Sequence, residues 1–306
     1  MTTQEKLKLI QRYSGLTQEQ LAAKVGVTFV ALNRWINAAS KPRPKSQAKI
    51  DALYLEYSGE KVIPESVLQA KKHALEMRCK KYSNILQTIL SRPDLRDQFD
   101  LSLTYHSNKI EGSTLSENET DAILFHNKVI PNKTLREQLE AKNHQTALHI
   151  LLEHSRIGGA FDENFILRLH GVLMSGIHPD AGTYRRHPVR ILGTRVVTAN
   201  YIKIPDLMMS LCEKISAASE DIVAWVSEVH AQFEKIHPFG DGNGRMGRLL
   251  MTGMLLRHNF PPALIKNDDR QKYFVYLSRA QESGDSSLLQ DFVCEAITEG
   301  FRIIYP

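Results

Sequence analysis

Residues 237–248 of the 306-residue chain read HPFGDGNGRMGR, and the prediction of the fold starts from this stretch. It joins two segments whose apolar residues recur at helical spacing, from Trp225 to Ile236 before it and from Met246 to Met254 after it. A glycine-rich loop that runs into a helix leaves backbone N–H groups free at the helix N-terminus, where the helix dipole favours an anion. The stretch therefore predicts a phosphate-binding loop between two amphipathic helices.

The side chains of this stretch supply the groups that transfer from a nucleotide requires. His237 titrates near neutral pH, so it can take a proton from an attacking hydroxyl group. Asp241 is a hard oxygen ligand suited to Mg²⁺ beside phosphate oxygens. Arg245 and Arg248, three residues apart on the first helical turns, can each hold a phosphate group. Together these groups indicate a reaction on a nucleoside triphosphate.

The same twelve residues match every defined position of the signature H-x-F-x-[D/E]-G-N-G-R-x-x-R and so resemble the Fic family. The resemblance extends over about residues 100–300, through segments 169–173 and 182–185. It implies a mostly α-helical fold, a Fic-like helical core with a β-hairpin flap. It also implies transfer of AMP from ATP to a serine, threonine or tyrosine hydroxyl of a protein, which can be the chain itself, with release of pyrophosphate.

The resemblance gives each position of the motif a role. His237 would be the general base, and Asp241 would hold Mg²⁺ against the α- and β-phosphates of ATP. Arg245 would bind the β-phosphate region and Arg248 the γ-phosphate. Tyr273 would pack against the adenine, although a core aromatic on an amphipathic helix is an equal interpretation. The backbone of three further residues would form the anion hole: Gly242, Asn243 and Gly244.

Residues 107–112 read SNKIEG and resemble the inhibitory-helix motif of the Fic family, [S/T]-x-x-x-E-[G/N]. By this resemblance Glu111 would pair with Arg248, the arginine otherwise reserved for the γ-phosphate. Ser107 would help to hold the inhibitory helix, and Gly112 would end it. ATP would then bind in a non-productive pose, and the enzyme would inhibit itself.

Residues 183–204 interrupt the helical pattern with two β-branched runs, at 189–191 and 195–198, around Gly193. These runs predict a β-hairpin. By resemblance the hairpin, at 184–200, is the Fic flap that lays the target segment beside the catalytic loop by strand addition.

The first sixty residues predict short helices with clear capping signals. Thr17 and Gln20 form a capping box at the start of one helix, and Gly26 ends it. Thr28 can cap the next helix. Two short helices joined by a tight turn with glycine predict a helix-turn-helix.

This region, about residues 4–56, resembles the repressor-type helix-turn-helix of many bacterial and phage regulators. The formal net charge is +5, and residues 1–60, with nine Lys/Arg and five Asp/Glu, carry +4 of it. By resemblance Asn33 would pair with adenine and Arg34 with guanine or a phosphate. Phe29 and Val30 depart from the polar residues usual at these positions, which leaves thymine-methyl contacts or no base reading there. A helix-turn-helix retained for protein–protein contact is the alternative.

The chain is thus divided into three parts: a helix-turn-helix domain at 1–58, a linker and helical connector at 59–100, and a Fic domain with its inhibitory helix at 101–306. Hydrophobic residues at 42% and charged residues at 24% exclude a disordered or fibrous class. Three dispersed cysteines predict neither a disulfide framework nor a zinc site. No signal peptide or bilayer-spanning run is evident, so we expect a cytoplasmic protein without a membrane partner.

Three alternatives for the function stay open. The same fold and motif can remove AMP from a protein, with Glu111 then positioning a water molecule. Relatives within the family also move phosphocholine or phosphate. The third alternative is a transcriptional regulator that binds DNA through residues 1–58 and senses nucleotide with its Fic domain. The sequence leaves the target protein and the oligomeric state undecided, a homo-oligomer included.

Overall fold

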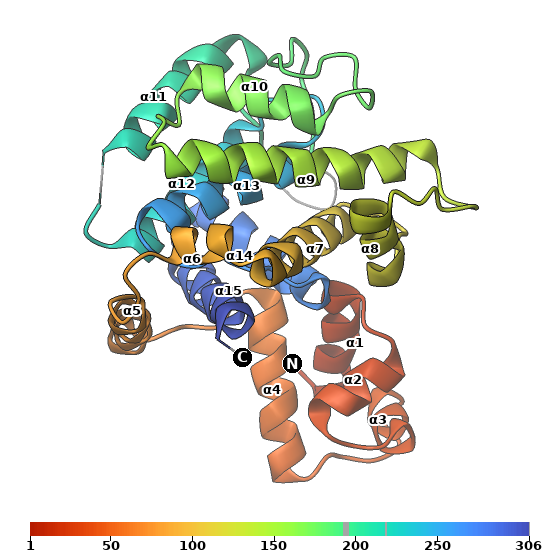
Figure 1. The fold of residues 1–306 in the computed structure, drawn as a ribbon. Coiled ribbons are helices and arrows are strands. Elements are labelled where there is room, and N and C mark those ends of the chain that lie inside the picture. Colours follow the sequence, from red (N-terminus) through yellow and green to blue (C-terminus); the bar gives the residue numbers. More distant parts are fainter. Residues whose placement is uncertain (192–195, 218, 306) are drawn as a thin grey trace.

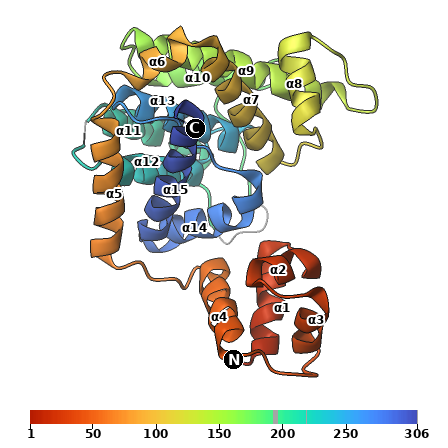
Figure 2. The same ribbon diagram turned by 60° about the horizontal axis from the view of Figure 1, so that its bottom comes forward.

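The computed structural model describes residues 1–191, 196–217 and 219–305, and these residues form helices and loops without a strand. The prediction of a mostly α-helical chain is therefore confirmed. An N-terminal group of four helices stands apart from the rest in both views (Figures 1 and 2). Its members are α1 (Thr3–Ser14), α2 (Gln18–Val25), α3 (Phe29–Ile36) and α4 (Pro44–Ser58).

Capping residues set where the helices of the N-terminal domain begin and end. Thr17 Oγ1 accepts the backbone N–H of Gln20 at 3.2 Å, and Gln20 Oε1 accepts that of Thr17 at 2.9 Å, so α2 begins with the predicted capping box. Gly26 ends α2 with a φ of 78°, a conformation that glycine adopts without steric cost. Trp35 packs into a hydrophobic core that belongs to this domain alone. The helix-turn-helix is confirmed.

The remaining helices share one large hydrophobic core. They are α5 (Glu65–Cys79), α6 (Ile85–Ser91), α7 (Pro93–Ile110), α8 (Glu117–His126), α9 (Leu135–Arg156), α10 (Glu163–Leu173), α11 (Ile204–Ser216), α12 (Ile222–Ile236), α13 (Asn243–Arg257), α14 (Arg270–Ser283) and α15 (Ser287–Ile304), with 3₁₀ turns η1 (Tyr201–Lys203) and η2 (Asn267–Asp269). Leu75, Ile85 and Phe99 are buried in this core. Residues 65–100 are therefore part of the main domain rather than a connector, and only about 59–64 link the two domains.

Helix α13 lies at the centre of the main domain. Its residues 245–256 are all buried, because α12, α9, α10 and α7 surround it. Helix α9 crosses in front of it in Figure 1. Gly253 allows the close approach, since a Cβ atom there would lie 2.7 Å from Phe161 and 2.8 Å from Leu151. The glycine-rich loop at 237–242 thus precedes a helix that the core of the main domain holds in place.

The two domains meet where α4 packs against α14 (Figure 2). Lys272 Nζ on α14 lies 3.2 Å from Glu56 Oε1 on α4, and the Lys272 side chain is largely buried. Arg279 of α14 also donates to the carbonyl of Gly59, the residue that ends α4. The helix-turn-helix is therefore fixed to the main domain by polar contacts at one end of α4.

The predicted β-hairpin is not confirmed. The described residues on both sides of 192–195 form no strand, and the expected turn at Gly193 lies outside the described residues. The two arms still meet, because Thr198 Oγ1 donates to the carbonyl of Val189 at 2.8 Å. Among the described residues, no helix combines the length and apolar character needed to cross a membrane.

Candidate functional site

The loop between α12 and α13 is closed by one side chain. The Asn243 amide accepts the backbone N–H of Phe239 at 2.9 Å and donates to the carbonyl of Phe239 at 2.9 Å. Phe239 is fully buried and anchors the loop in the core. Because both polar ends of the Asn243 amide are used, its side chain shapes the loop, and backbone N–H groups remain for an anion.

His170 of α10 supports the loop from beneath, a role that the sequence did not reveal. Its ring stacks on Phe239 with 3.6 Å between the centroids. Nδ1 accepts the N–H of Gly182 at 3.0 Å, so Nε2 carries the proton and donates to the carbonyl of Asp241 at 3.0 Å. Burial lowers the pKa of His170 to about 4, so the ring stays neutral at physiological pH. The resemblance through segment 169–173 was its only signal.

His237 ends α12 in the left-handed region, with a φ of 52°. For a residue other than glycine this conformation costs about 1–2 kcal/mol. His237 Nδ1 donates to the carbonyl of Glu234 at 3.1 Å, which leaves Nε2 without a proton and free to accept one. Burial also lowers the pKa of His237 from its usual 6.5. The histidine thus has the tautomer and charge of a general base.

Arg185 connects the loop after α12 to segment 184–200. Its side chain is 2% exposed and donates to the carbonyl of His237 at 2.7 Å and to that of Ala199 at 2.6 Å. It also donates to the carbonyl of His187 at 2.8 Å. Arg185 lies within a segment that carries the family resemblance, but the sequence predicted no role for it. The structure shows that this one guanidinium fixes both ends of the segment beside the histidine.

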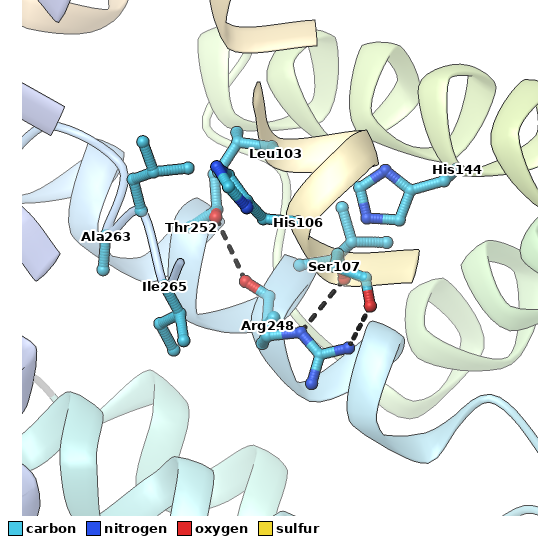
Figure 3. Close-up of a pocket in the computed structure, with 10 residues that line it drawn as sticks. Leu103, His106, Ser107, His144, Arg248, Thr252, Ala263 and Ile265 are labelled. Atoms are coloured by element: carbon cyan, nitrogen blue, oxygen red, sulfur yellow. Dashed lines mark hydrogen bonds between the residues drawn. The ribbon is translucent and has the colours of Figure 1, made fainter. Parts of the chain in front are cut away.

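Arg248 is held by the end of helix α7. Its Nη2 lies 2.7 Å from Glu111 Oε1, and its Nε donates to Ser107 Oγ at 3.0 Å. Figure 3 shows Ser107 receiving two bonds from the guanidinium, the second at its carbonyl. Gly112, with a φ of 103°, follows Glu111 as the chain leaves the helix. The structure thus brings Ser107, Glu111 and Arg248 together.

The space for the Glu111 carboxylate comes from Gly244, because a Cβ atom at that position would overlap Glu111 Oε1. Behind Arg248 lies a cavity of about 20 Å³, lined by Ser107 and His144 among others (Figure 3). That volume suits one water molecule and no more. This cavity is therefore too small for a phosphate group or a nucleotide.

The carboxylate of Asp241 lies among charged groups. Arg245 Nη2 lies 3.4 Å from Asp241 Oδ1, and Arg136 Nη2 of α9 lies 2.6 Å from Oδ2. Burial alone would raise the pKa of Asp241, but the two arginines and the N–H of Gly242 outweigh it and lower the pKa. The Asp241 carboxyl is therefore ionised.

The residues around Asp241 fit a magnesium ion bound together with a nucleotide. Among the described residues, no group of three or more His, Cys, Asp or Glu side chains could hold a metal ion. A single carboxylate suffices where phosphate oxygens and water complete the octahedral shell of Mg²⁺. Asp241 is thus the protein ligand that the chain offers, and the nucleotide would provide the others.

Tyr273 does not face the loop. Its side chain is 1% exposed, and its hydroxyl bonds to His230 Nε2 at 2.7 Å. Its ring centroid lies 6.0 Å from the Arg248 guanidinium, on the core side. The structure therefore favours the core interpretation over contact with adenine, because α14 turns this face of the helix inward.

The candidate DNA contacts lie on α3, in the other domain. Asn33 Nδ2 donates to Gln18 Oε1 at 3.0 Å, and Asn33 Oδ1 accepts from Asn37 at 3.0 Å. Both ends of the Asn33 amide are thus engaged within the domain. Arg34 is exposed. Phe29 and Val30 are 45% and 64% exposed at the start of the helix.

Comparison with known proteins supports both domains. Residues 160–255 match the family model described as Fic/DOC family, and residues 14–52 match one described as helix-turn-helix. The chain is 31% identical over 191 residues to the protein adenylyltransferase Fic of Nematostella vectensis, an alignment that covers 58% of this chain and 42% of that protein. The chain thus spans less than half the length of this relative.

Two solved structures show the same fold. A fragment of Fic-1 from Caenorhabditis elegans is 20% identical with a TM-score of 0.67, and the match covers 98% of this chain and 96% of that one. IbpAFic2 covalently tethered to Cdc42 is 15% identical with a TM-score of 0.51, covering 95% of this chain and 94% of that one. The chain therefore has the fold of these two structures, with residues 160–255 similar to the Fic/DOC family and residues 14–52 similar to the helix-turn-helix family.

Proposed function

We propose that this chain transfers AMP from ATP to a hydroxyl group on a protein. One observation carries the proposal. His237, whose Nε2 has no proton, lies at the start of the same loop that leads into the N-terminus of α13, where backbone N–H groups can bind phosphate. Relatives at about 30% identity are named protein adenylyltransferases, which supports the same reaction.

In the proposed reaction the triphosphate lies along the N-terminus of α13. The N–H groups of Asn243 and Gly244 and the guanidinium of Arg245 would bind its oxygens, whereas the N–H of Gly242 is already donated to Asp241 Oδ1. Arg248 would bind the γ-phosphate once it has left Glu111. Asp241 would hold Mg²⁺, which neutralises phosphate charge when bound. The target oxygen forms a bond to the α-phosphorus, and the bond from that phosphorus to the bridging oxygen breaks. Pyrophosphate leaves, and His237 Nε2 takes the hydroxyl proton.

Segment 184–200 is the proposed docking edge for the target protein. Arg185 holds both of its ends beside His237, and Val197 within it is 82% exposed. An extended segment of a partner can add to such an edge through main-chain hydrogen bonds. The structure of IbpAFic2 tethered to Cdc42 supports a protein as the target class.

The position of the label on ATP tests the reaction. The chain would be incubated with cell lysate and ATP labelled at either the α- or the γ-phosphorus, and proteins would be separated by electrophoresis. AMP transfer requires protein-bound label from α-labelled ATP and none from γ-labelled ATP. Label from the γ position alone would indicate phosphate transfer, and loss of AMP from a modified protein without any incorporation would indicate the reverse reaction.

The lowered pKa of His237 predicts the pH dependence of the transfer. The reactive form of a general base is the unprotonated one, so the rate falls as pH falls through the pKa. Because burial lowers that pKa, we expect the acid limb of kcat/KM to have its midpoint below 6.5. Initial rates between about pH 5 and 8 would measure it. A midpoint at or above 6.5 would contradict the assignment of His237.

We propose in addition that residues 1–58 bind duplex DNA through α3. The match to a helix-turn-helix model, the exposed Arg34 and the concentration of positive charge in this domain support the proposal. Because the Asn33 amide already bonds to Gln18 and Asn37, Asn33 is a weaker candidate for reading a base than the sequence suggested.

Replacing Arg34 by alanine is expected to weaken DNA binding, because a phosphate contact is lost. The logarithm of the DNA association constant decreases with the logarithm of the salt concentration, and the steepness of this decrease should become smaller by about 1. Fluorescence anisotropy with a mixed-sequence duplex at several salt concentrations would measure it. Arg92→Ala is the matched control, since Arg92 is an exposed arginine of the other domain, paired with Asp94. Equal slopes for wild type and Arg34→Ala would exclude Arg34 from the interface.

A further inference from the structure

Four charged side chains form a closed ring around Asp241. Arg136 Nη2 lies 2.6 Å from Asp241 Oδ2, and Arg136 Nε donates to Glu140 Oε1 at 3.2 Å. Glu140 Oε1 lies 3.2 Å from Arg245 Nη1, and Arg245 Nη2 lies 3.4 Å from Asp241 Oδ1. Arg136 and Glu140 come from α9, whereas Asp241 and Arg245 come from the loop and α13. The ring thus joins two elements about a hundred residues apart.

The two oxygens of Asp241 have different partners. Oδ1 accepts the N–H of Gly242 at 2.6 Å and lies near Arg245, which is 2% exposed and fixed in the core. Oδ2 faces Arg136, whose side chain is 56% exposed. Oδ2 is therefore the oxygen that a cation from solvent can reach. Its present partner, Arg136, is the most exposed member of the ring.

A guanidinium and a divalent cation bound to this same oxygen would repel each other. Mg²⁺ binds carboxylate oxygen at about 2.0–2.1 Å. An arginine nitrogen still bonded to the same oxygen would lie within about 4 Å of that ion, and the two like charges would repel. Glu140 gives the displaced arginine a second partner, because Arg136 Nε already bonds to it one helical turn away. Arg136 can therefore leave Asp241 without losing all of its electrostatic stabilisation.

We propose that Arg136 competes with the divalent cation for Asp241 and so sets the affinity of the site for metal. This inference rests on the proposed function, in which nucleotide and metal bind together at Asp241. Arg136 acts through Asp241 and is a positioning residue, not a group that touches the reacting atoms. It also differs from the Glu111 contact, because it opposes the metal and not the γ-phosphate.

The test measures metal binding directly, without turnover. Wild type and Arg136→Gln are saturated with α,β-methylene-ATP, in which the bond to the leaving group cannot break. Binding of Mn²⁺ is then followed by loss of the free-ion signal in electron paramagnetic resonance. We expect Arg136→Gln to bind Mn²⁺ about two- to fivefold more tightly, the scale of removing one exposed ion pair. Arg156→Gln is the matched control, an exposed arginine of α9 paired only with Glu153 among the described residues.

Two further measurements keep the outcomes separate. If the ion binds at Asp241, adding Asp241→Asn to both proteins should abolish the difference in Mn²⁺ affinity between wild type and Arg136→Gln. Equal or weaker Mn²⁺ binding by Arg136→Gln, with the analogue bound, would overturn this inference alone. Failure of the analogue to bind wild type and the Glu111→Gly variant would overturn the proposed function and the inference with it. Because Arg136 is exposed, its replacement leaves the core unchanged, and circular dichroism would verify the fold.

Discussion

Replacing Glu111 by glycine is expected to raise AMP incorporation into protein by about ten- to a hundredfold. In the structure the Glu111 carboxylate occupies Arg248 Nη2 at 2.7 Å, the group proposed for the γ-phosphate. A hydrogen bond between charged groups contributes about 1.5–3 kcal/mol, and each 1.4 kcal/mol is about a factor of ten in the population of the free arginine. Removing the carboxylate leaves Arg248 on Ser107 and open to ATP from the side of the loop.

The measurement is incorporation of label from α-labelled ATP into the chain itself and into lysate proteins. Glu111→Gln should give a smaller rise, because the amide keeps one hydrogen bond to Arg248 but loses the charge. Glu117→Gly is the matched control, an exposed glutamate at the start of α8. If Glu111→Gly incorporates no more label than wild type and the control, Glu111 does not restrain the enzyme.

Replacing His237 by alanine in the Glu111→Gly background is expected to lower the rate of transfer by about 10²–10⁴-fold. The imidazole Nε2 is the proposed acceptor of the hydroxyl proton, and the Nδ1 bond to the Glu234 carbonyl fixes it in that tautomer. ATP binding should change little, because the phosphate-binding groups come from residues 242–248. Loss of kcat without loss of nucleotide affinity is thus the expected signature.

Isothermal titration with the methylene analogue and single-turnover rates would separate binding from chemistry. His126→Ala provides the matched control, since His126 is an exposed histidine on α8, 58% accessible at its side chain. A rate within about tenfold of the Glu111→Gly parent would remove His237 from the role of base. A large loss of thermal stability would be detected as a fall in Tm and would call for His237→Gln as a second variant.

The parts of this molecule that were predictable from the sequence are those set by local chemistry. The capping box of Thr17 and Gln20 and the left-handed Gly26 are determined within a few residues, and the helix-turn-helix follows from them. The catalytic loop is equally local, since His237 to Arg248 are one short stretch. The pairing of Glu111 with Arg248 joins distant residues, and only the resemblance to a family motif suggested it.

The parts that were missed depend on contacts between distant segments. Arg185 reaches the carbonyl of His237, 52 residues away, and Arg136 reaches Asp241, 105 residues away. No spacing or periodicity encodes such contacts. The strand prediction in 183–204 relied on β-branched residues, whose preference for strands depends on neighbours to pair with. Likewise, composition could not show that residues 65–100 belong to the main core, because burial is decided by the packing of α5 to α7.

Gly244 links the sequence of the loop to the position of Glu111 at the end of α7. A side chain at this position would overlap Glu111 Oε1, so any mutation that adds a Cβ atom pushes the carboxylate off Arg248. The two segments are more than a hundred residues apart in sequence, yet a substitution at 244 would change the contact that Glu111 makes. If Glu111 restrains the enzyme as proposed, a side chain at 244 would remove that restraint in a single step, and a variant without Glu111 would not need glycine on this account. The sequence of the loop and the position of the Glu111 carboxylate are thus coupled by sterics.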